Sequence, residues 1–69
     1  MKVHVRDGDA IRKKAIENGM GVKELAEKIN VTGGHLSNIL NGRAHPRPVV
    51  AKKMVECLRC DFEEIFFVK

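Results

Sequence analysis

The chain has little of what metal-binding and disulfide-stabilised proteins need. Its two cysteines, Cys57 and Cys60, form a single Cys-x-x-Cys, and its three histidines are His4, His35 and His45. A structural zinc site takes four ligands, and a disulfide framework takes more cysteines than two. The histidines are scattered without metal-ligand spacing. We therefore expect no metal or other cofactor, and we interpret both cysteines as small apolar core residues of a reduced protein.

The sequence also lacks any long apolar run and any catalytic signature. We therefore expect neither a signal peptide nor a membrane span, and a cytoplasmic protein is the default expectation. No nucleophile stands at a useful spacing from a base, and Gly33-Gly34 lacks the preceding strand and further glycines of a phosphate-binding loop. These absences argue against an enzyme, and no small-molecule ligand is evident.

What the chain does have is a small size and a basic balance. Its 69 residues are enough for one domain, 1–69, which buries only about 60 % of its unfolded surface. Thirteen Lys and Arg residues oppose nine Asp and Glu residues, for a formal net charge of +4. That balance suits a polyanionic partner such as nucleic acid, although many small basic proteins bind none.

The segment from Val22 to Gly42 is the most informative part of the sequence. Asn30 tolerates the left-handed conformation that closes a helix, and Thr32 stands where the next helix needs an N-cap. The two helices on either side are marked by apolar residues at spacings of three and four: Leu25, Ala26 and Ile29, then Leu36, Ile39 and Leu40. We therefore predict a helix-turn-helix unit over 22–41, with its second helix running from Gly33 to about Asn41.

Further helices are predicted on both sides of this unit. Asp9 is interpreted as the N-cap of a first helix over about Ala10–Asn18, which ends at Gly19, and Gly21 as the cap of the second. A fourth helix starts at Pro48, runs to about Arg59 and faces inward with Ala51, Met54, Val55 and Leu58. Asp61 and Glu64 have capping-box spacing for a short fifth helix.

The two ends of the chain are predicted to be strands. Val3 and Val5 alternate with polar residues, and Phe66-Phe67-Val68 is aromatic and β-branched. A lone strand leaves backbone groups unpaired, so we predict that the two termini pair as a two-stranded sheet. Exchange of these strands between protomers is the competing use of the same edges.

In the order and spacing of its predicted helices and turns, the chain resembles the Cro/C1-type (XRE-like) helix-turn-helix family of phage and bacterial repressors. The resemblance covers about residues 10–66. The matching residues are Leu25-Ala26, the turn at 30–32, Ser37 with Ile39, Asn41-Gly42 with Arg43 and Pro46, and Leu58 followed by Asp61. The resemblance implies an all-α, compact five-helix, lambda-repressor-like domain in the bacterial cytoplasm. It also implies double-stranded DNA as the partner. One such domain buries too little surface for tight selectivity, so we expect a homodimer.

Several positions depart from the family pattern. Ala15 and Leu40 stand where members often pair an Arg with a Glu, and Val22 stands where a Gln often contacts phosphate. Replacing both partners of a buried pair can be neutral, so this double change fits the fold. Gly33 and Gly34 stand where relatives often carry long polar side chains. Either the bare backbone lets the helix approach DNA closely, or the site needs little direct readout; both explanations stay open.

The resemblance and the helical geometry together give the candidate DNA contacts. Asn38 has an amide that matches the edge of adenine, while Ser37 suits base or phosphate and His35 suits phosphate. Arg43 and Arg47 suit phosphate or the minor groove, and Lys23 suits phosphate. The full predicted set is Lys23, Thr32, Gly33, Gly34, His35, Ser37, Asn38, Asn41, Arg43 and Arg47. Lys52, Lys53 and Arg59 are interpreted as a solvated outer face of the fourth helix.

The functional hypothesis is a small, repressor-like transcriptional regulator that places its recognition helix in the major groove and binds a palindromic operator as a dimer. The alternative is a protein-interaction module of the same fold, such as an antitoxin or anti-repressor. An exposed apolar surface at 66–68 would mark a dimer interface or a partner site.

Overall fold

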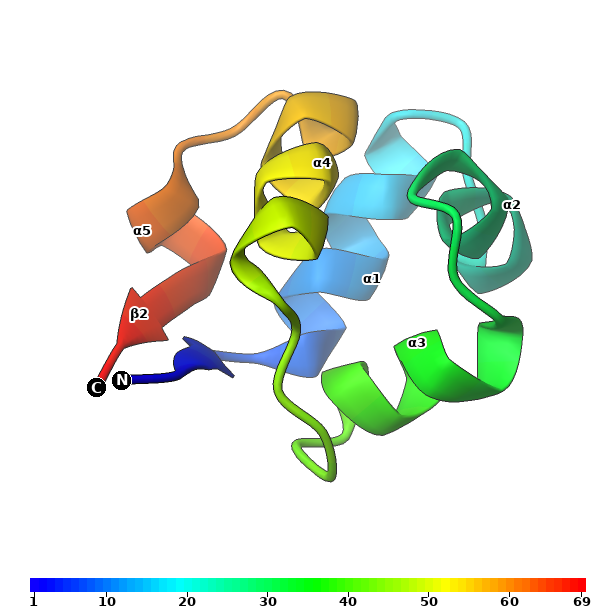
Figure 1. Ribbon diagram of the computed structural model, residues 1–69. Helices are drawn as coiled ribbons and strands as arrows, with labels where there is room; N and C mark the ends of the chain where they lie inside the picture. Colours follow the sequence, from blue (N-terminus) through cyan, green and yellow to red (C-terminus); the bar gives the residue numbers. More distant parts are fainter.

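The computed structural model describes residues 1–69 and contains five helices and a two-stranded sheet (Figure 1). In chain order the elements are β1 (Val3–Val5), α1 (Gly8–Glu17), α2 (Val22–Lys28), α3 (Gly33–Leu40), α4 (Pro48–Leu58), α5 (Phe62–Ile65) and β2 (Phe66–Val68). In Figure 1, α1 runs through the middle of the molecule, with α2 and α3 on one side and α4, α5 and the sheet on the other. This arrangement confirms the predicted all-α fold with five helices and a terminal strand pair.

Each helix end is explained by a local signal, with one correction. The cap of α1 is Asp7 and not Asp9: the Asp9 backbone N–H donates to Asp7 Oδ1 at 3.0 Å, and the helix starts at Gly8. Both residues are good caps, and the choice falls to Asp7 because β1 ends just before it. Gly19 ends the helix with a φ of 78°, as predicted.

The ends of α4 and α5 also follow the sequence closely. Pro48 occupies the first turn of α4 as predicted, and the helix ends at Leu58, after which Arg59 takes the left-handed conformation with a φ of 55°. Glu64 Oε2 accepts a hydrogen bond from the Asp61 backbone N–H at 2.7 Å, which is the expected contact from Glu64 to the cap of α5.

The core receives residues from every helix and both strands. Thirteen apolar residues form it: Val3, Ile11, Ala15, Leu25, Ala26, Ile29, Leu36, Leu40, Ala51, Met54, Leu58, Ile65 and Phe66. Ala15 and Leu40 are 1 % and 5 % exposed, so the two positions where the family often carries an ion pair are both apolar and buried here. Because neither partner is charged, no buried charge is left uncompensated.

Three residues that were predicted to belong to the core lie at its edge. Val55 is only half-buried, although it packs against the core as expected. Cys57 and Cys60 are free and half-buried, and they pack against the core from its margin instead of lying inside it. Burial raises the pKa of the Cys60 thiol, against a smaller opposing effect of Lys14, so this thiol is protonated at neutral pH.

The sheet joins the two ends of the same chain. β1 and β2 are antiparallel, with Val3 opposite Val68, His4 opposite Phe67 and Val5 opposite Phe66. Lys2 and Lys69 extend the ladder with reciprocal backbone hydrogen bonds of 2.9 and 3.0 Å. The predicted pairing of the termini is therefore confirmed as an intrachain sheet.

Candidate nucleic-acid interface

The turn between α2 and α3 is fixed by the backbone of the residues that close α2. Asn30 has a φ of 62°, in the left-handed region that asparagine tolerates. Its N–H donates to the Glu27 carbonyl at 3.2 Å, and the Val31 N–H donates to the Ala26 carbonyl at 3.0 Å. This pair of bonds is the Schellman arrangement, and Val31 packs against the core as such a turn favours. The turn therefore sets the angle between the two helices.

Thr32 then starts α3 as predicted. Its Oγ1 accepts a hydrogen bond from the His35 backbone N–H at 3.1 Å, which satisfies one of the free donors of the first turn. Gly33 and Gly34 occupy the first two helical positions, and no atom lies within 4 Å of where a Cβ would stand on either. The start of α3 is therefore open on its outer side, and its backbone is bare there.

The two faces of α3 divide as the helical period requires. Leu36, Ile39 and Leu40 are buried, whereas Ser37 is half-buried. The remaining α3 candidates all lie exposed: Gly33, Gly34, His35 and Asn38, followed by Asn41 at the C-cap. α3 carries no acidic residue, so the helix itself offers no charge that repels phosphate. The exposed face of α3 can therefore present an amide, an imidazole and bare backbone to a groove.

Three exposed cations lie on the segments before and after α3 in the chain. Arg43 is held at the end of α3, because Gly42 takes a φ of 77° and the Arg43 N–H donates to the Asn38 carbonyl at 2.8 Å. Arg47 is exposed at the far end of the same loop, and Lys23 is exposed in the first turn of α2.

At the start of α2, Glu24 Oε1 accepts from the Gly21 N–H at 2.8 Å, so the predicted cap at Gly21 is present.

Two contacts that position α3 were not evident from the sequence. Arg12 Nη1 forms an ion pair with Asp9 at 3.0 Å, while Arg12 Nη2 donates to Asn41 Oδ1 at 3.2 Å. Gly8 lies so close to the last turn of α3 that a Cβ there would stand 2.1 Å from the Leu40 carbonyl oxygen. The contacts of α1 with α3 join residues about thirty positions apart, so no local pattern predicts them. They give Asn41 a structural partner and make α1 a support for α3.

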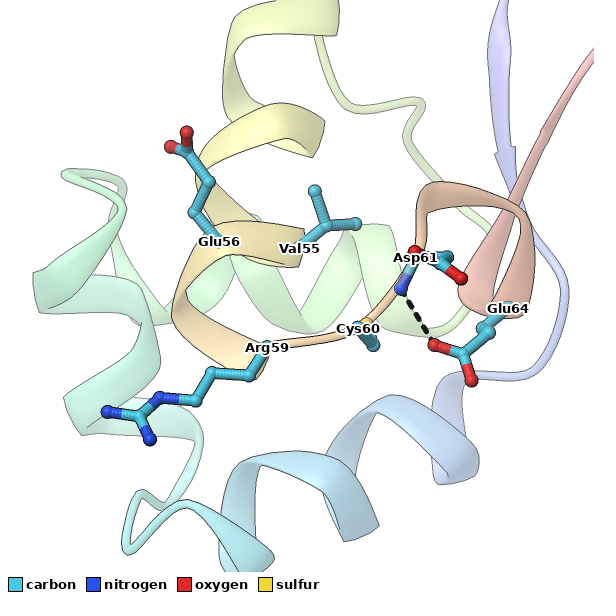
Figure 2. A pocket seen from close by; sticks show the side chains of 6 residues that line it. All are labelled: Val55, Glu56, Arg59, Cys60, Asp61 and Glu64. Carbon is cyan, nitrogen blue, oxygen red and sulfur yellow. Dashed lines mark hydrogen bonds between the residues drawn. The ribbon is translucent and has the colours of Figure 1, made fainter.

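The surface has hollows elsewhere, and the one shown in Figure 2 lies at the end of α4. It is lined by Val55, Glu56, Arg59, Cys60, Asp61 and Glu64. Arg59 extends away from Asp61 and Glu64 in this view, and the drawn hydrogen bond is the helix-capping contact between those two residues. The carboxylate of Glu64 and the backbone of Asp61 are thus occupied in holding α5, and the thiol of Cys60 is not activated.

Comparison with known proteins gives a family. A family model described as helix-turn-helix matches residues 11–65. The chain is also 30 % identical over 66 residues to an "Uncharacterized HTH-type transcriptional regulator YvzC" of Bacillus subtilis (strain 168), covering 96 % of this chain and 84 % of that protein.

No solved structure matches the chain. None of its helices is long and apolar enough to cross a membrane. The family match spans the turn, the exposed face of α3 and the cationic loop that follows. The chain therefore belongs to the Cro/C1-type helix-turn-helix family, and it is a DNA-binding regulator and not an enzyme.

Proposed function

We propose that residues 1–69 act as one domain that binds double-stranded DNA sequence-specifically and regulates transcription, with α3 in the major groove. The observation that carries the proposal is the exposed, acid-free face of α3 between flanking cations. Asn38 is the proposed base-reading residue, because its amide can donate and accept on the adenine edge. Lys23, Arg43 and Arg47 are the proposed phosphate contacts, which supply affinity without reading sequence.

The other proposed contacts have smaller roles. Ser37 and His35 lie on the same helix as Asn38. Ser37 is assigned to contact either a base or a phosphate, and His35 is assigned to contact phosphate. Thr32 serves as the cap and brings the backbone of Gly33 and Gly34 toward the duplex. We expect Asn41 to act on DNA mainly through its place beside Arg12.

We further propose a homodimer on a palindromic operator, in the cytoplasm, with repression as the expected direction because the chain resembles repressors. One module of this size contacts too few base pairs for tight selectivity. Two copies related by a two-fold axis would read half-sites about 34 Å apart, one turn of the duplex. Sedimentation of the protein with a selected duplex tests this: a ratio of one chain per duplex would contradict the dimer.

The protein-interaction alternative has less support from the structure. Phe66 is buried, and the Phe67 ring stacks on His4 with centroids 5.0 Å apart. Of the three apolar residues at this end, only Val68 is well exposed, at 48 %. The end of the chain therefore offers no broad apolar patch for a partner protein.

The test is selection of bound sequences from a random duplex pool, followed by mobility shifts in a salt series. We expect a palindromic motif and binding that weakens steeply with salt. Asn38→Ala should change the selected sequence, whereas Arg43→Ala should weaken all duplexes about equally. Lys53→Ala, on the outer face of α4, is the control for Arg43→Ala because it removes the same charge. Absence of any enriched sequence, with no binding to any duplex, would refute the proposal.

A further inference from the structure

The outward side of the terminal sheet carries a set of cations that the helix-turn-helix does not use. Side chains alternate along a strand, so Lys2, His4 and Arg6 share one side while Val3 enters the core. The strand register places Phe67 opposite His4, and the terminal hydrogen bonds place Lys69 opposite Lys2. We call these five residues the sheet face: Lys2, His4, Arg6, Phe67 and Lys69.

Contacts among its members hold the centre of the sheet face in place. The His4 and Phe67 rings are stacked with an angle of 13° between their planes. The Arg6 guanidinium lies 5.3 Å from the centre of the Phe67 ring, and Arg6 Nε donates to the Glu63 carbonyl at 2.7 Å. The guanidinium therefore has a defined position before any ligand arrives, which lowers the entropy lost on binding.

None of these cations forms an ion pair with a carboxylate. The single ion pair of the chain joins Arg12 to Asp9, so the sheet face contributes to none. The pKa of His4 is lowered by desolvation first, and then by the charges of His45, Lys69 and Lys2. The groups that face His4 are thus the Phe67 ring, His45 and two lysines, none of them acidic. The sheet face therefore presents Lys2, Arg6 and Lys69 without ion-pair partners, which favours an anionic ligand.

The sheet face is continuous with the proposed DNA surface. His45 comes from the loop that also holds Arg43 and Arg47, and its ring meets that of His4 edge-on with centroids 4.5 Å apart. In Figure 1 this loop runs from α3 past the junction of β1 and α1 to α4, and the two chain ends lie together at the outer end of the sheet. Cations therefore extend from the end of α3, through the loop, to the sheet.

We propose that the sheet face binds the phosphate backbone of the duplex whose bases α3 reads, outside the base pairs that α3 contacts. The inference rests on the proposed function of α3. Phosphate is favoured over an unpaired base because the Phe67 ring is already stacked against His4 and lies under Arg6. Lysine and arginine side chains supply the donors that phosphate oxygens accept.

The test compares two double variants that remove the same charge. Lys2→Gln/Lys69→Gln alters the sheet face, and Lys13→Gln/Lys14→Gln alters α1, where Lys14 lies near Cys60. Both pairs leave the backbone ladder intact, and circular dichroism melting confirms that each variant folds. Affinity for the selected duplex, carrying extra flanking base pairs, is measured by fluorescence anisotropy from about 0.05 to about 0.3 M salt.

Loss of two phosphate contacts should reduce the slope of log K against log salt by about 1.8, and affinity at about 0.1 M salt should fall roughly tenfold or more. The control pair should keep the wild-type slope. On a duplex trimmed to the selected base pairs, wild type and sheet-face variant should converge, because the flanking phosphates are gone.

The outcomes separate this inference from the function on which it rests. If the wild type binds no duplex at all, the proposed function itself fails. If the wild type binds and the sheet-face variant matches the control in slope and affinity, only the sheet-face inference is overturned. The sheet-face inference is likewise overturned if that variant loses binding to single-stranded DNA or to anionic vesicles while its duplex affinity is unchanged.

Discussion

Gly8 lies where the first turn of α1 meets the end of α3, and replacing it with alanine tests how tightly these helices are packed. A Cβ at Gly8 would stand 2.1 Å from the Leu40 carbonyl oxygen and 2.9 Å from the carbonyl carbon. Both are backbone atoms, so no rotamer change relieves the clash. α3 would have to move by roughly an ångström relative to α1, and overpacking of this kind costs about 1–3 kcal/mol.

Helix propensity works in the opposite direction and decides the net value. Alanine is favoured over glycine by up to about 1 kcal/mol within a helix, and by less in its first turn. We therefore expect Gly8→Ala to lower the free energy of unfolding by about 1–2 kcal/mol. For a domain of this size, that corresponds to a fall in Tm of about 4–16 °C.

Gly33→Ala is the matched control, because nothing lies within 4 Å of its added methyl group. It should raise stability by a few tenths to about 1 kcal/mol through propensity and a smaller unfolded-state entropy. Thermal and urea unfolding, followed by circular dichroism, measure both variants. The packing argument would be refuted if the Gly8→Ala variant were as stable as the wild type. It would also be refuted if both variants changed in stability by the same amount and in the same direction.

Three further changes have defined outcomes. Thr32→Ala should destabilise the fold by about 1 kcal/mol while Thr32→Ser restores it, as measured by urea unfolding; an equal loss in both would show that the hydroxyl cap is not the cause. Arg59→Gly should raise Tm, because Arg59 has a φ of 55° and a side chain in that conformation costs about 1 kcal/mol; an unchanged or lower Tm would argue that Arg59 contributes by its contacts. The pKa of His4 is lowered below 6.5, so the unfolded chain binds this proton first as the pH falls, and the native state loses stability below pH 6.5. The Tm of the wild type should therefore fall more than the Tm of His4→Gln between about pH 7.5 and about pH 5.5. Equal falls in Tm would contradict the expected effect of His4.

Gly33 and Gly34 can be tested as a pair. Alanine at both positions should stabilise α3, since each methyl group enters open space. If the bare backbone approaches DNA closely, the same double variant should bind the selected duplex more weakly despite its greater stability. If duplex affinity is unchanged, the glycines reflect a site that needs little direct readout. Anisotropy and thermal melting on the same samples separate the two explanations.

Local sequence signals were sufficient for most of the fold. Asn30 and Thr32 mark the turn because one tolerates a positive φ and the other supplies a cap, and neither property depends on distant residues. The alternation at Val3 and the β-branched end at Val68 likewise indicated the strands. Their mutual pairing followed from the need of each strand for a hydrogen-bond partner.

What the sequence could not supply was the contact between helices that are distant in the chain. Asp7 and Asp9 are equally good caps by type, and only the end of β1 decides between them. The approach of Gly8 to Leu40 and the bond from Arg12 to Asn41 depend on the angle between α1 and α3. The exposed candidates on α3 could be derived from helical period, whereas which of them contact DNA depends on a partner that the chain alone does not contain.

The reciprocal backbone bonds between Lys2 and Lys69 bring the two ends of the described chain to one point on its surface. Any segment joined before Lys2 or after Lys69 would leave the domain there, beside the sheet face. An affinity tag at either end is therefore not a neutral addition, because both ends lie on the side proposed to meet the duplex. An acidic tag would compete with phosphate, and a bulky one would screen the flanking base pairs. Binding measurements should thus use tag-free protein, and a direct peptide link between the ends should close the chain with little loss of loop entropy.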